Sequence, residues 1–483
     1  MMFVFAVLLS SVFANLAPVR AEQNINFRSI AYGADPVKFQ EITEIEDMSA
    51  DPVPWNVDMV DAETTGNEGE DIYVAILDTG LLSNYLDFFP ESMVDIKEEW
   101  GIGFSHDVWY DPLGDGNWST EVAGGVEYKF SYGPVRNDRG FITHDNGAPD
   151  KYGYGWGSGH GTHVTSIVTG YHFWRTTVDT WIAGVAPKVT LIPVLVLDDW
   201  IEFAPGGGWM WTGGTWEMIA EGIKYIGDLA EEHGIKIIIN MSLGGGSPST
   251  MIEQAINYAI NRGVIVVASA GNDGYAGMGW PGAYPQVISV AAAGWTQEYG
   301  GGNYQDGYYW WWNDVPEKLN TNNYVEDLDG TTYKNNWHAY LTDFSSRANS
   351  TLGQSWTDLD VAAPGAAIRG PYKPYGSTQF GFYGVWGTSQ AAPHVSGIAA
   401  LVLESYPNLA QAEMETILKH AAKRIPLAAD GAYVSDVFSD FAIWYYWWND
   451  HDAGSGFLTV DEAMSSAHRL TRRAGGSSGC TLR

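Results

Sequence analysis

The chain has 483 residues, with 58 acidic and 25 basic side chains and a formal net charge of −33 at pH 7. A surface this acidic repels phosphate backbones, which argues against a nucleic-acid-binding protein. Hydrophobic residues make up 45% of the chain, enough for a sizeable core, so a disordered chain is excluded. The one cysteine, Cys480, has no disulfide partner within the chain, so stability must come from packing, with or without metal ions.

Residues 1–21 have the pattern of a secretory signal peptide. Phe3 to Ala17 is mostly apolar, and Val19-Arg20-Ala21 offers a small-residue cleavage site. No Lys or Arg precedes the apolar run, which leaves a short membrane anchor or a misassigned start codon as alternatives. Because no other stretch approaches about 20 uninterrupted apolar residues, we expect no transmembrane span in the mature chain and a secreted or cell-envelope location.

Strand-like and helix-like segments alternate along the middle of the chain. The strand-like segments are apolar without alternation, as in parallel strands covered on both faces, and they are 71–80, 189–197, 235–241, 264–269 and 287–293. Helical spacing of apolar residues marks 216–233 and 251–262 between them. This order predicts an α/β fold with a mostly parallel central sheet and helices on both faces.

Three segments rich in Gly, Asn, Asp, Trp and Tyr interrupt the pattern, and we interpret them as surface insertions near 101–155, 198–214 and 296–341. Aromatic runs at Tyr308–Trp312 and Tyr445–Trp448 either pack against the domain or form an exposed rim that extends a binding groove. The basic, Gly/Ser-rich end of the chain, 468–483, is predicted to be a flexible tail.

Three short motifs carry residues suited to catalysis. Asp78 follows a buried strand, His160 lies between two glycines at a predicted helix start, and Ser389 precedes a helix of small residues. Each has an alternative: a simple turn at Asp78, a metal site of His160 with His163 or a satisfied histidine, and an N-cap at Ser389. Together they stand in the order Asp, His, Ser, which is the order of one known type of catalytic triad.

At this point the sequence resembles a known family. The motifs AILDTG, GHGTHV and GTSQAAPHVSG, around Asp78, His160 and Ser389, are similar to signatures of the subtilisin-like serine proteases, the subtilase family of peptidase S8 type. The resemblance runs over 51–467, which it identifies as a peptidase domain carrying the insertions. It implies a subtilisin-like three-layer fold and a secreted serine endopeptidase that needs no cofactor for its chemistry and acts on proteins or peptides. We expect a monomer.

The resemblance also assigns roles to single residues. Ser389 matches the nucleophile, His160 the general base, Asp78 the carboxylate that orients His160, and Asn272 the oxyanion-hole side chain. Further matches are expected to bind substrate through the backbone or to shape the specificity pocket, and they are Ser242, Leu243, Gly244, Gly271 and Gly279. A glycine at position 279 leaves room for a large P1 side chain.

Three departures from the family pattern stand out. Residues 22–50 are short for an inhibitory pro-domain, which suggests a reduced pro-segment or one truncated upstream. Asp87 lies where the family often places a calcium carboxylate, but 171–181 lacks the expected Asn-rich partner loop. Asp87 is thus one candidate ligand for a structural calcium ion. The acids of the insertions are either further oxygen ligands or solvated surface charges, and they are Asp111, Asp115, Asp306, Asp314, Asp327 and Asp329. Gln390 stands where the family usually has Met.

Two other classes of protein compete with an active protease. An inactive binding or scaffold relative with the same fold is one, and the intact set of Asp78, His160, Ser389 and Asn272 argues against it. An α/β-hydrolase esterase is the other, but its Gly-x-Ser-x-Gly pattern occurs only at 475–479, with no strand before it.

Overall fold

The computed structural model describes residues 53–111, 129–143, 157–295 and 339–476, with short interruptions at 176–177, 205–206, 375–376, 378, 426–431, 436–442, 447 and 450. It also describes four short strands outside these ranges: β1 Ile30–Tyr32, β2 Lys38–Glu41, β16 Tyr324–Glu326 and β17 Thr332–Lys334. The insertion acids at 115, 306, 314, 327 and 329 and the aromatic run 308–312 lie outside the described residues.

A mostly parallel sheet forms the centre of the molecule, in the strand order β18-β15-β14-β13-β3-β10-β4, with β19 on β15 and β5 on β10. Only the β15–β18 pair of this sheet is antiparallel among the described strands. The bounds are β3 Tyr73–Asp78, β4 Asp95–Ile96, β5 Ile102–Gly103, β10 Thr190–Leu195, β13 Ile237–Met241, β14 Ile265–Ser269, β15 Ile288–Trp295, β18 Ala339–Leu341 and β19 Val361–Pro364. All five strands expected from apolar runs are present.

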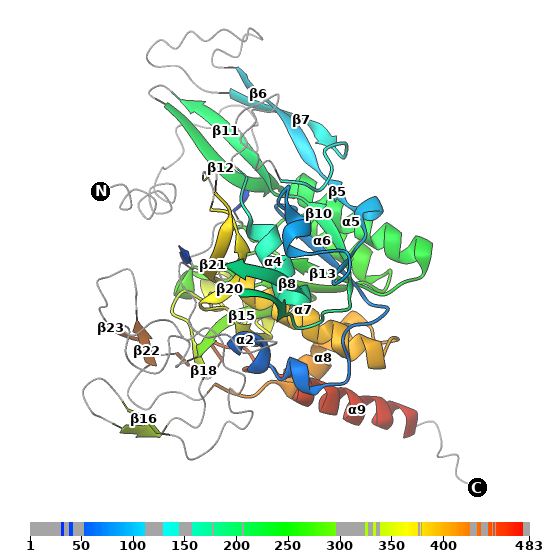
Figure 1. Cartoon of the computed structure of the whole chain (residues 1–483), viewed down its shortest axis with the longest axis vertical. Helices are drawn as coiled ribbons and strands as arrows, with labels where there is room; N and C mark the ends of the chain where they lie inside the picture. The colour runs from blue at the N-terminus through cyan, green and yellow to red at the C-terminus, as the bar shows by residue number, and fades with distance from the viewer. Residues whose placement is uncertain are drawn as a thin grey trace.

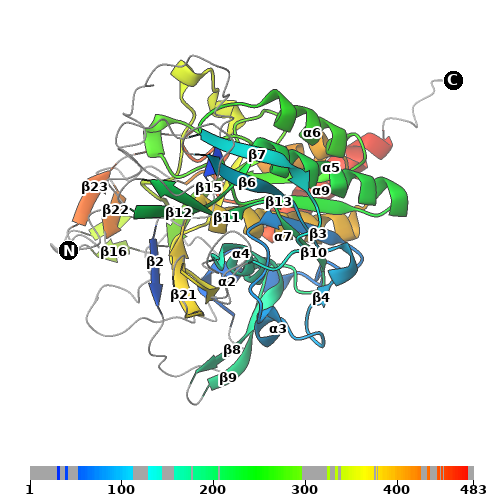
Figure 2. The same cartoon turned by 90° about the horizontal axis from the view of Figure 1, so that it is seen from above.

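Helices cover both faces of this sheet, which confirms the predicted three-layer arrangement. Figure 2 shows α5 and α6 on one side of β13 and β3, and α4 and α7 on the other. The long helices are α4 His160–Thr169, α5 Trp216–His233, α6 Thr250–Ile260, α7 Thr388–Ser405, α8 Gln411–Ala421 and α9 Val460–Gly476. The short ones are α2 Trp55–Asp58 and α3 Tyr85–Phe88. Both predicted helices between the strands, α5 and α6, begin and end within two residues of their expected bounds.

The described parts of the insertions include antiparallel hairpins as well as β5 and β18 of the central sheet. β6 Ser105–Asp111 pairs with β7 Lys129–Arg136, and β11 Asp198–Ala204 pairs with β12 Gly207–Thr215. Figure 1 shows these two hairpins together at one end of the molecule. Elsewhere lie the hairpins β8 Gly170–Arg175 with β9 Val178–Ala183, β20 Ile368–Tyr372 with β21 Gly381–Trp386, β16 with β17, and β22 Ala432–Ser435 with β23 Ile443–Tyr446.

The structure describes parts of the C-terminal region for which the sequence made two predictions, a flexible tail and a second aromatic run. Helix α9 continues to Gly476, so 468–476 are helical where a flexible tail was predicted. The physical reason is packing: Ala467 is buried and Leu470 packs on the main core, so the helix is held by one apolar stripe. Of the second aromatic run, Trp448 is buried in the main core, in line with the packing alternative for that residue.

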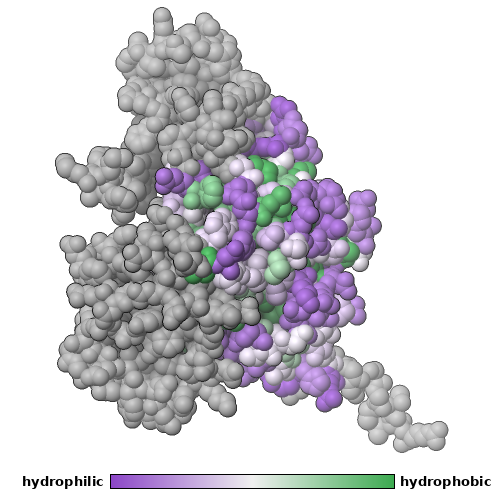
Figure 3. Space-filling view, viewed as in Figure 1, coloured by the Kyte–Doolittle hydropathy of each residue, from purple (hydrophilic) through white to green (hydrophobic). Residues whose placement is uncertain are grey.

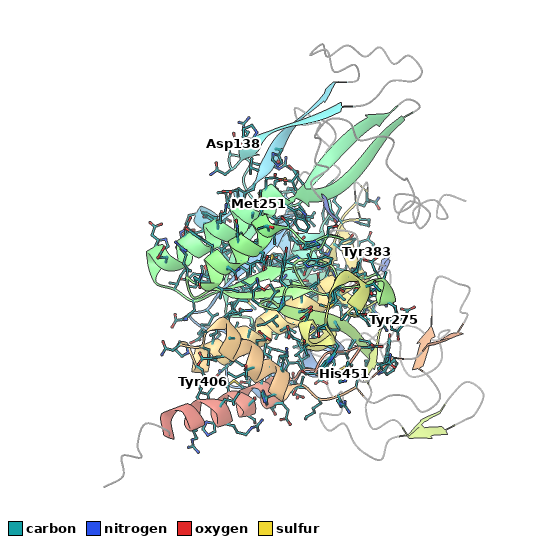
Figure 4. The ribbon with its side chains drawn as sticks, turned by 180° about the vertical axis from the view of Figure 1, so that it is seen from behind. Asp138, Met251, Tyr275, Tyr383, Tyr406 and His451 are labelled. Carbon is teal, nitrogen blue, oxygen red and sulfur yellow. The ribbon has the colours of Figure 1, made fainter. Side chains whose placement is uncertain are left out.

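The surface of the described part is mostly hydrophilic on the face seen in Figure 3, with small hydrophobic spots between polar areas. From behind, Figure 4 places Tyr275 and His451 on the same side of the molecule, and Tyr406 beside α9. The Tyr275 hydroxyl donates to Asp452 at 3.0 Å, which ties the loop after Asn272 to the segment before α9. Among the described residues, no helix is long and apolar enough to cross a membrane.

Candidate active site

The acid of the site stands at the carboxyl end of a central strand. Asp78 is the last residue of β3 and is fully buried. Its Oδ1 accepts hydrogen bonds from the Thr79 backbone N–H at 2.7 Å and from His160 Nδ1 at 2.8 Å. The second bond fixes the Nδ1–H tautomer of His160 and leaves the Nε2 lone pair free to take up a proton.

The base begins helix α4, which the end of β3 holds in place. The Gly161 backbone N–H donates to Thr79 Oγ1 at 2.9 Å, next to His160. A Cβ at Gly161 would come within 2.3 Å of the Gly80 carbonyl oxygen, so a glycine is required for this approach. His160 has no exposed surface, and neither has its partner Asp78. Gly161 therefore reflects close packing of α4 on the end of β3, whereas Gly159 packs against the Lys373 backbone, where a Cβ would come within 2.3 Å of the Lys373 nitrogen.

His163, the alternative metal partner of His160, belongs to the core. Its Nε2 lies 3.1 Å from the Ile368 carbonyl oxygen, a backbone partner outside any ligand set. Burial, followed by the charge of His160, lowers the pKa of His163 to about 3, so it is neutral at physiological pH. Among the described residues no group of three or more Asp, Glu, His or Cys side chains is placed to hold a metal ion. The two histidines thus serve separate roles.

Ser389, the predicted nucleophile, lies in the first turn of α7, at the end of the helix where the backbone N–H groups are free of helical partners. Ser389 is next to the ends of β13 and β14: Ser242, just after β13, donates from Oγ to the Ser389 carbonyl oxygen at 2.7 Å. Strand β13 pairs directly with β3, with Asn240 opposite Ile76, so Ser242 and Asp78 leave the sheet at the same level. The register therefore brings Ser389 beside the Asp78–His160 pair.

The hydroxyl of Ser389 is turned away from the imidazole in this state. Its Oγ donates to the Ser242 carbonyl oxygen at 3.2 Å, and His160 Nε2 has no hydrogen-bond partner within the described part of the chain. Catalytic hydrogen bonds are often open in the absence of substrate. A rotation about one side-chain bond of Ser389 would be needed to complete the triad.

Asn272 presents an amide N–H beside Ser389. Its Oδ1 accepts from the Thr388 backbone N–H and from Thr388 Oγ1, both at 2.9 Å, which fixes the side chain and leaves Nδ2 as the outward donor. A Cβ on Gly387 would lie 3.6 Å from that Nδ2 and 2.8 Å from Gln390 Oε1. A side chain at position 387 would therefore collide with Gln390 and would also contact the Asn272 amide nitrogen.

The predicted substrate-binding residues line two facing backbone segments. Gly244 and Gly279 face each other, since a Cβ on either would be in ordinary contact with the other segment at 3.5–3.8 Å. Paired hydrogen bonds between Gly245 and Trp280, at 2.8 and 2.9 Å, hold the segments together. Gly271 has φ +104°, and a Cβ there would press on Ser346 Oγ at 3.0 Å. Leu243 is buried in the main core.

The environment of Asp87 differs from an oxygen cage. Asp87 is exposed, and its carboxylate accepts from Asn84 Nδ2 at 3.1 Å. Across from it lies the β8–β9 hairpin, whose His172 contacts the Asp87 carbonyl oxygen through Nδ1 at 3.2 Å and Asp179 through Nε2 at 2.5 Å. A hard cation prefers several converging oxygens, and the described residues around Asp87 do not supply them. The calcium prediction gains no support here.

Several residues near Ser389 were not identified from the sequence. Pro393 stands four residues after Ser389 and removes the helical N–H that would bind its carbonyl. Asn240 and Ser396 form buried hydrogen bonds behind the nucleophile. His394 Nδ1 donates to the Gln390 carbonyl at 2.8 Å, and its Nε2 accepts from Asn56. The helix of small residues that the sequence predicts after Ser389 in fact begins at Thr388, so that Pro393 lies inside it.

An imidazole oriented by a buried carboxylate, beside a serine at a helix start, defines a serine peptidase that works through an Asp–His–Ser triad. The sequence model of the Subtilase family matches residues 69–442, more than half of the chain. The protein therefore belongs to the subtilase family of serine endopeptidases, as its motifs predicted.

The individual relatives that match this chain have only moderate sequence identity to it. A subtilisin of Bacillus sp. (strain TA39) is 32% identical over 317 residues, which cover 62% of this chain and 57% of that protein. Subtilisin DY of Bacillus licheniformis is 25% identical over 383 residues, or 78% of this chain and 93% of that one. Among solved structures, S41 Psychrophilic Protease is 22% identical, with a TM-score of 0.49, covering 86% of this chain and all of that chain.

Proposed function

We propose that the protein is a secreted endopeptidase that cleaves peptide bonds through an acyl-enzyme on Ser389. The observation that carries this is the 2.8 Å hydrogen bond between Asp78 and His160, fully buried beside the start of α7. Ser389 Oγ attacks the scissile carbonyl carbon while its proton passes to His160 Nε2. The C–N bond breaks as that proton moves to the leaving amine, and a water molecule repeats the sequence to release the acid.

The developing oxyanion is stabilised by the Asn272 side chain and the Ser389 backbone N–H. Asn272 suits this role because its Oδ1 is bound twice by Thr388 and cannot turn toward the substrate. A donor fixed before the reaction needs no reorganisation when negative charge forms. Asp78 stabilises the imidazolium that exists during the same step.

The slot between Gly244 and Gly279 is proposed to take the P1 side chain. The absence of side chains at Gly244 and Gly279 supports the family's assignment of these positions to the pocket wall, and we expect that pocket to take a large apolar or aromatic group. Asp273 follows the oxyanion donor and is exposed, and the whole chain carries a net charge of −33. Acidic P1 residues are therefore disfavoured, whereas Lys and Arg are tolerated. Cleavage of a peptide library would settle this, and efficient cleavage after Glu would contradict it.

The test of the function itself is covalent labelling. A fluorescent fluorophosphonate should label the wild-type protein, and peptide mapping should place the label on Ser389. Ser389→Ala should take up no label and lose at least about a thousandfold in kcat, with its thermal unfolding midpoint unchanged. A labelled Ser389→Ala protein, or one that keeps its activity, would point to another nucleophile.

Residues 22–50 are proposed to act as the pro-segment. Strand β2 pairs antiparallel with β21, with Lys38 opposite Trp386, three residues before Ser389. Strand β1 pairs in the same sense with the end of β12, from Ile30 to Thr215. Strand β2 therefore runs beside the strand that leads to Ser389, and Figure 2 shows β2 alongside β21. Sequencing the N-terminus of the protein as activity appears should find cleavage between 41 and 53; full activity of the uncleaved chain would contradict the proposal.

A further inference from the structure

Helix α7 has a gap in its backbone hydrogen bonding at the nucleophile. In a regular helix the N–H of residue 393 would bind the Ser389 carbonyl oxygen, but residue 393 is proline and has no N–H. A buried carbonyl left without a donor is costly. Here the Ser242 hydroxyl, from the end of another element, donates to it at 2.7 Å. A side chain of the neighbouring segment thus completes the turn that carries the nucleophile.

The Ser242 hydroxyl is itself held by a directed chain of hydrogen bonds. Ser396 Oγ donates to Asn240 Oδ1 at 2.9 Å, and Asn240 Nδ2 donates to Ser242 Oγ at 3.0 Å. Ser396, Asn240 and Ser242 have no exposed surface. Each hydroxyl group donates one hydrogen bond, and the Asn240 amide accepts one through Oδ1 and donates one through Nδ2. All the bonds therefore run in one direction, from Ser396 to the Ser389 carbonyl oxygen.

We propose that Ser396, acting through Asn240 and Ser242, is a positioning residue for the nucleophile Ser389. The inference rests on the proposed protease function and adds a residue that touches neither substrate nor reacting atoms. This series of hydrogen bonds starts at Ser396, two turns after Ser389 on α7, crosses to β13, and returns to the first turn of α7. It therefore fixes that turn against the strand end from which Asn240 and Ser242 come.

The orientation of Ser389 depends on Ser242 at two points. The Ser242 hydroxyl donates to the Ser389 carbonyl, and the Ser242 carbonyl accepts the Ser389 hydroxyl at 3.2 Å. A Ser242 backbone that shifts by a few tenths of an ångström changes both contacts together. Without the Ser396 hydroxyl, Asn240 Oδ1 loses its buried donor and Asn240 is free to turn, which releases the Ser242 hydroxyl from its fixed direction.

The experiment uses the full chain with three substitutions. Ser396→Ala removes the hydroxyl, Ser396→Cys keeps the volume with a much weaker donor, and Ser289→Ala is the matched control. Ser289 is also fully buried, but its Oγ has no hydrogen-bond partner in the described part of the chain. The readouts are the rate constant of fluorophosphonate labelling and kcat and KM for a short peptide, each per titrated active site.

Both Ser396 variants should lose about fivefold to tenfold in labelling rate and kcat, the value of roughly one buried hydrogen bond, with KM within twofold of wild type. Ser289→Ala should match wild type in all three. In a Pro393→Ala background, which restores a helical donor to the Ser389 carbonyl, the Ser396→Ala loss should shrink. If Ser396→Cys behaves as wild type, or Ser396→Ala as Ser289→Ala, the positioning role is wrong. Failure of wild-type labelling would instead contradict the protease function.

Discussion

The two largest hydrophobic clusters in the described part of the protein are built from different residues and have different roles. The main cluster surrounds the central sheet and is mostly aliphatic, with many alanines where helix α7 passes through it. The smaller cluster joins α3, the β8–β9 hairpin and β21, and six of its ten buried residues are aromatic. The first surrounds the elements that carry Asp78 at the end of β3, His160 at the start of α4 and Ser389 in the first turn of α7, whereas the second contains none of these residues.

The smaller cluster connects the flanks of the site. Strand β8 follows directly from α4, which begins with His160, and β21 leads to Ser389. Phe88 of α3 stacks on Trp174 of β8 at a centroid distance of 5.2 Å and meets Phe382 of β21 edge-on at 5.8 Å. The family places a calcium loop in this region by resemblance, and here aromatic contacts hold the same elements together. We therefore expect that catalysis and the stability of the surrounding elements can be altered separately.

The largest expected effect is on stability, at Phe88. Phe88→Ala should lower the free energy of unfolding by about 3–5 kcal/mol, because it empties a fully buried aromatic site. Urea unfolding in a Ser389→Ala background avoids self-digestion. Phe380→Ala is the control, since Phe380 also contacts Phe88 but is 48% exposed, and it should cost well under half as much. A large fall in kcat per titrated site in Phe88→Ala would show that the two clusters are not separable.

A substitution at Asn272 should instead lower kcat and leave the aromatic cluster intact. Asn272→Asp keeps an oxygen for the two Thr388 donors but replaces the Nδ2 donor with a second oxygen. We expect kcat to fall by about 10²–10³, with KM nearly constant, in a steady-state assay on a short peptide. Asn272→Ala loses the Thr388 bonds as well and should also be less stable. If Asn272→Asp kept its kcat, the oxyanion donor would have to be another group.

The contrast between the clusters also explains which parts could be predicted from the sequence. Apolar runs and helical spacing located β3, β13 and α5 because each of these elements buries its own side chains in the main core. The motifs located Asp78, His160 and Ser389 because their chemistry requires fixed residue types. The aromatic cluster is assembled from α3, β8 and β21, which are far apart in the chain, so no local sequence pattern predicts it.

The hydrogen bonds behind Ser389 could not be predicted from the sequence for the same reason. Asn240 and Ser396 are separated by 156 positions and meet only when α7 lies across β13. The tail from 468 was misjudged because its composition is polar overall, while one stripe that includes Ala467 and Leu470 packs on the core. Composition describes an average over residues, and packing depends on which face each residue occupies.

A third prediction concerns acid stability of the main core. Burial lowers the pKa of His394 from 6.5 to about 4, and protonation would set Nε2–H against the Asn56 amide that donates to it. The unfolded chain takes up this proton below about pH 6.5 while the folded chain does not, so stability falls as pH drops from 6.5 to 4. The loss is roughly 3 kcal/mol.

Urea unfolding at several pH values, again in a Ser389→Ala background, measures this. His394→Gln cannot titrate, so its stability should fall by roughly 3 kcal/mol less than that of the parent between pH 6.5 and 4. His420→Gln serves as the control because His420 is exposed, and it should follow the parent profile. Equal pH profiles for His394→Gln and the parent would remove His394 as the source.

The smallest effect is expected at Gln390, beside the nucleophile. Gln390 is fully buried, and neither its Nε2 nor its Oε1 has a hydrogen-bond partner in the described part of the chain. An unsatisfied buried amide is costly, so Gln390→Met should raise the free energy of unfolding by about 1–2 kcal/mol.

The same change adds a thioether next to Ser389, which peroxide converts to a polar sulfoxide. The wild-type protein should therefore keep its activity in peroxide longer than Gln390→Met. Both proteins share the other methionines, so oxidation elsewhere affects them equally. Inactivation at one rate in both would show that position 390 does not set oxidant sensitivity.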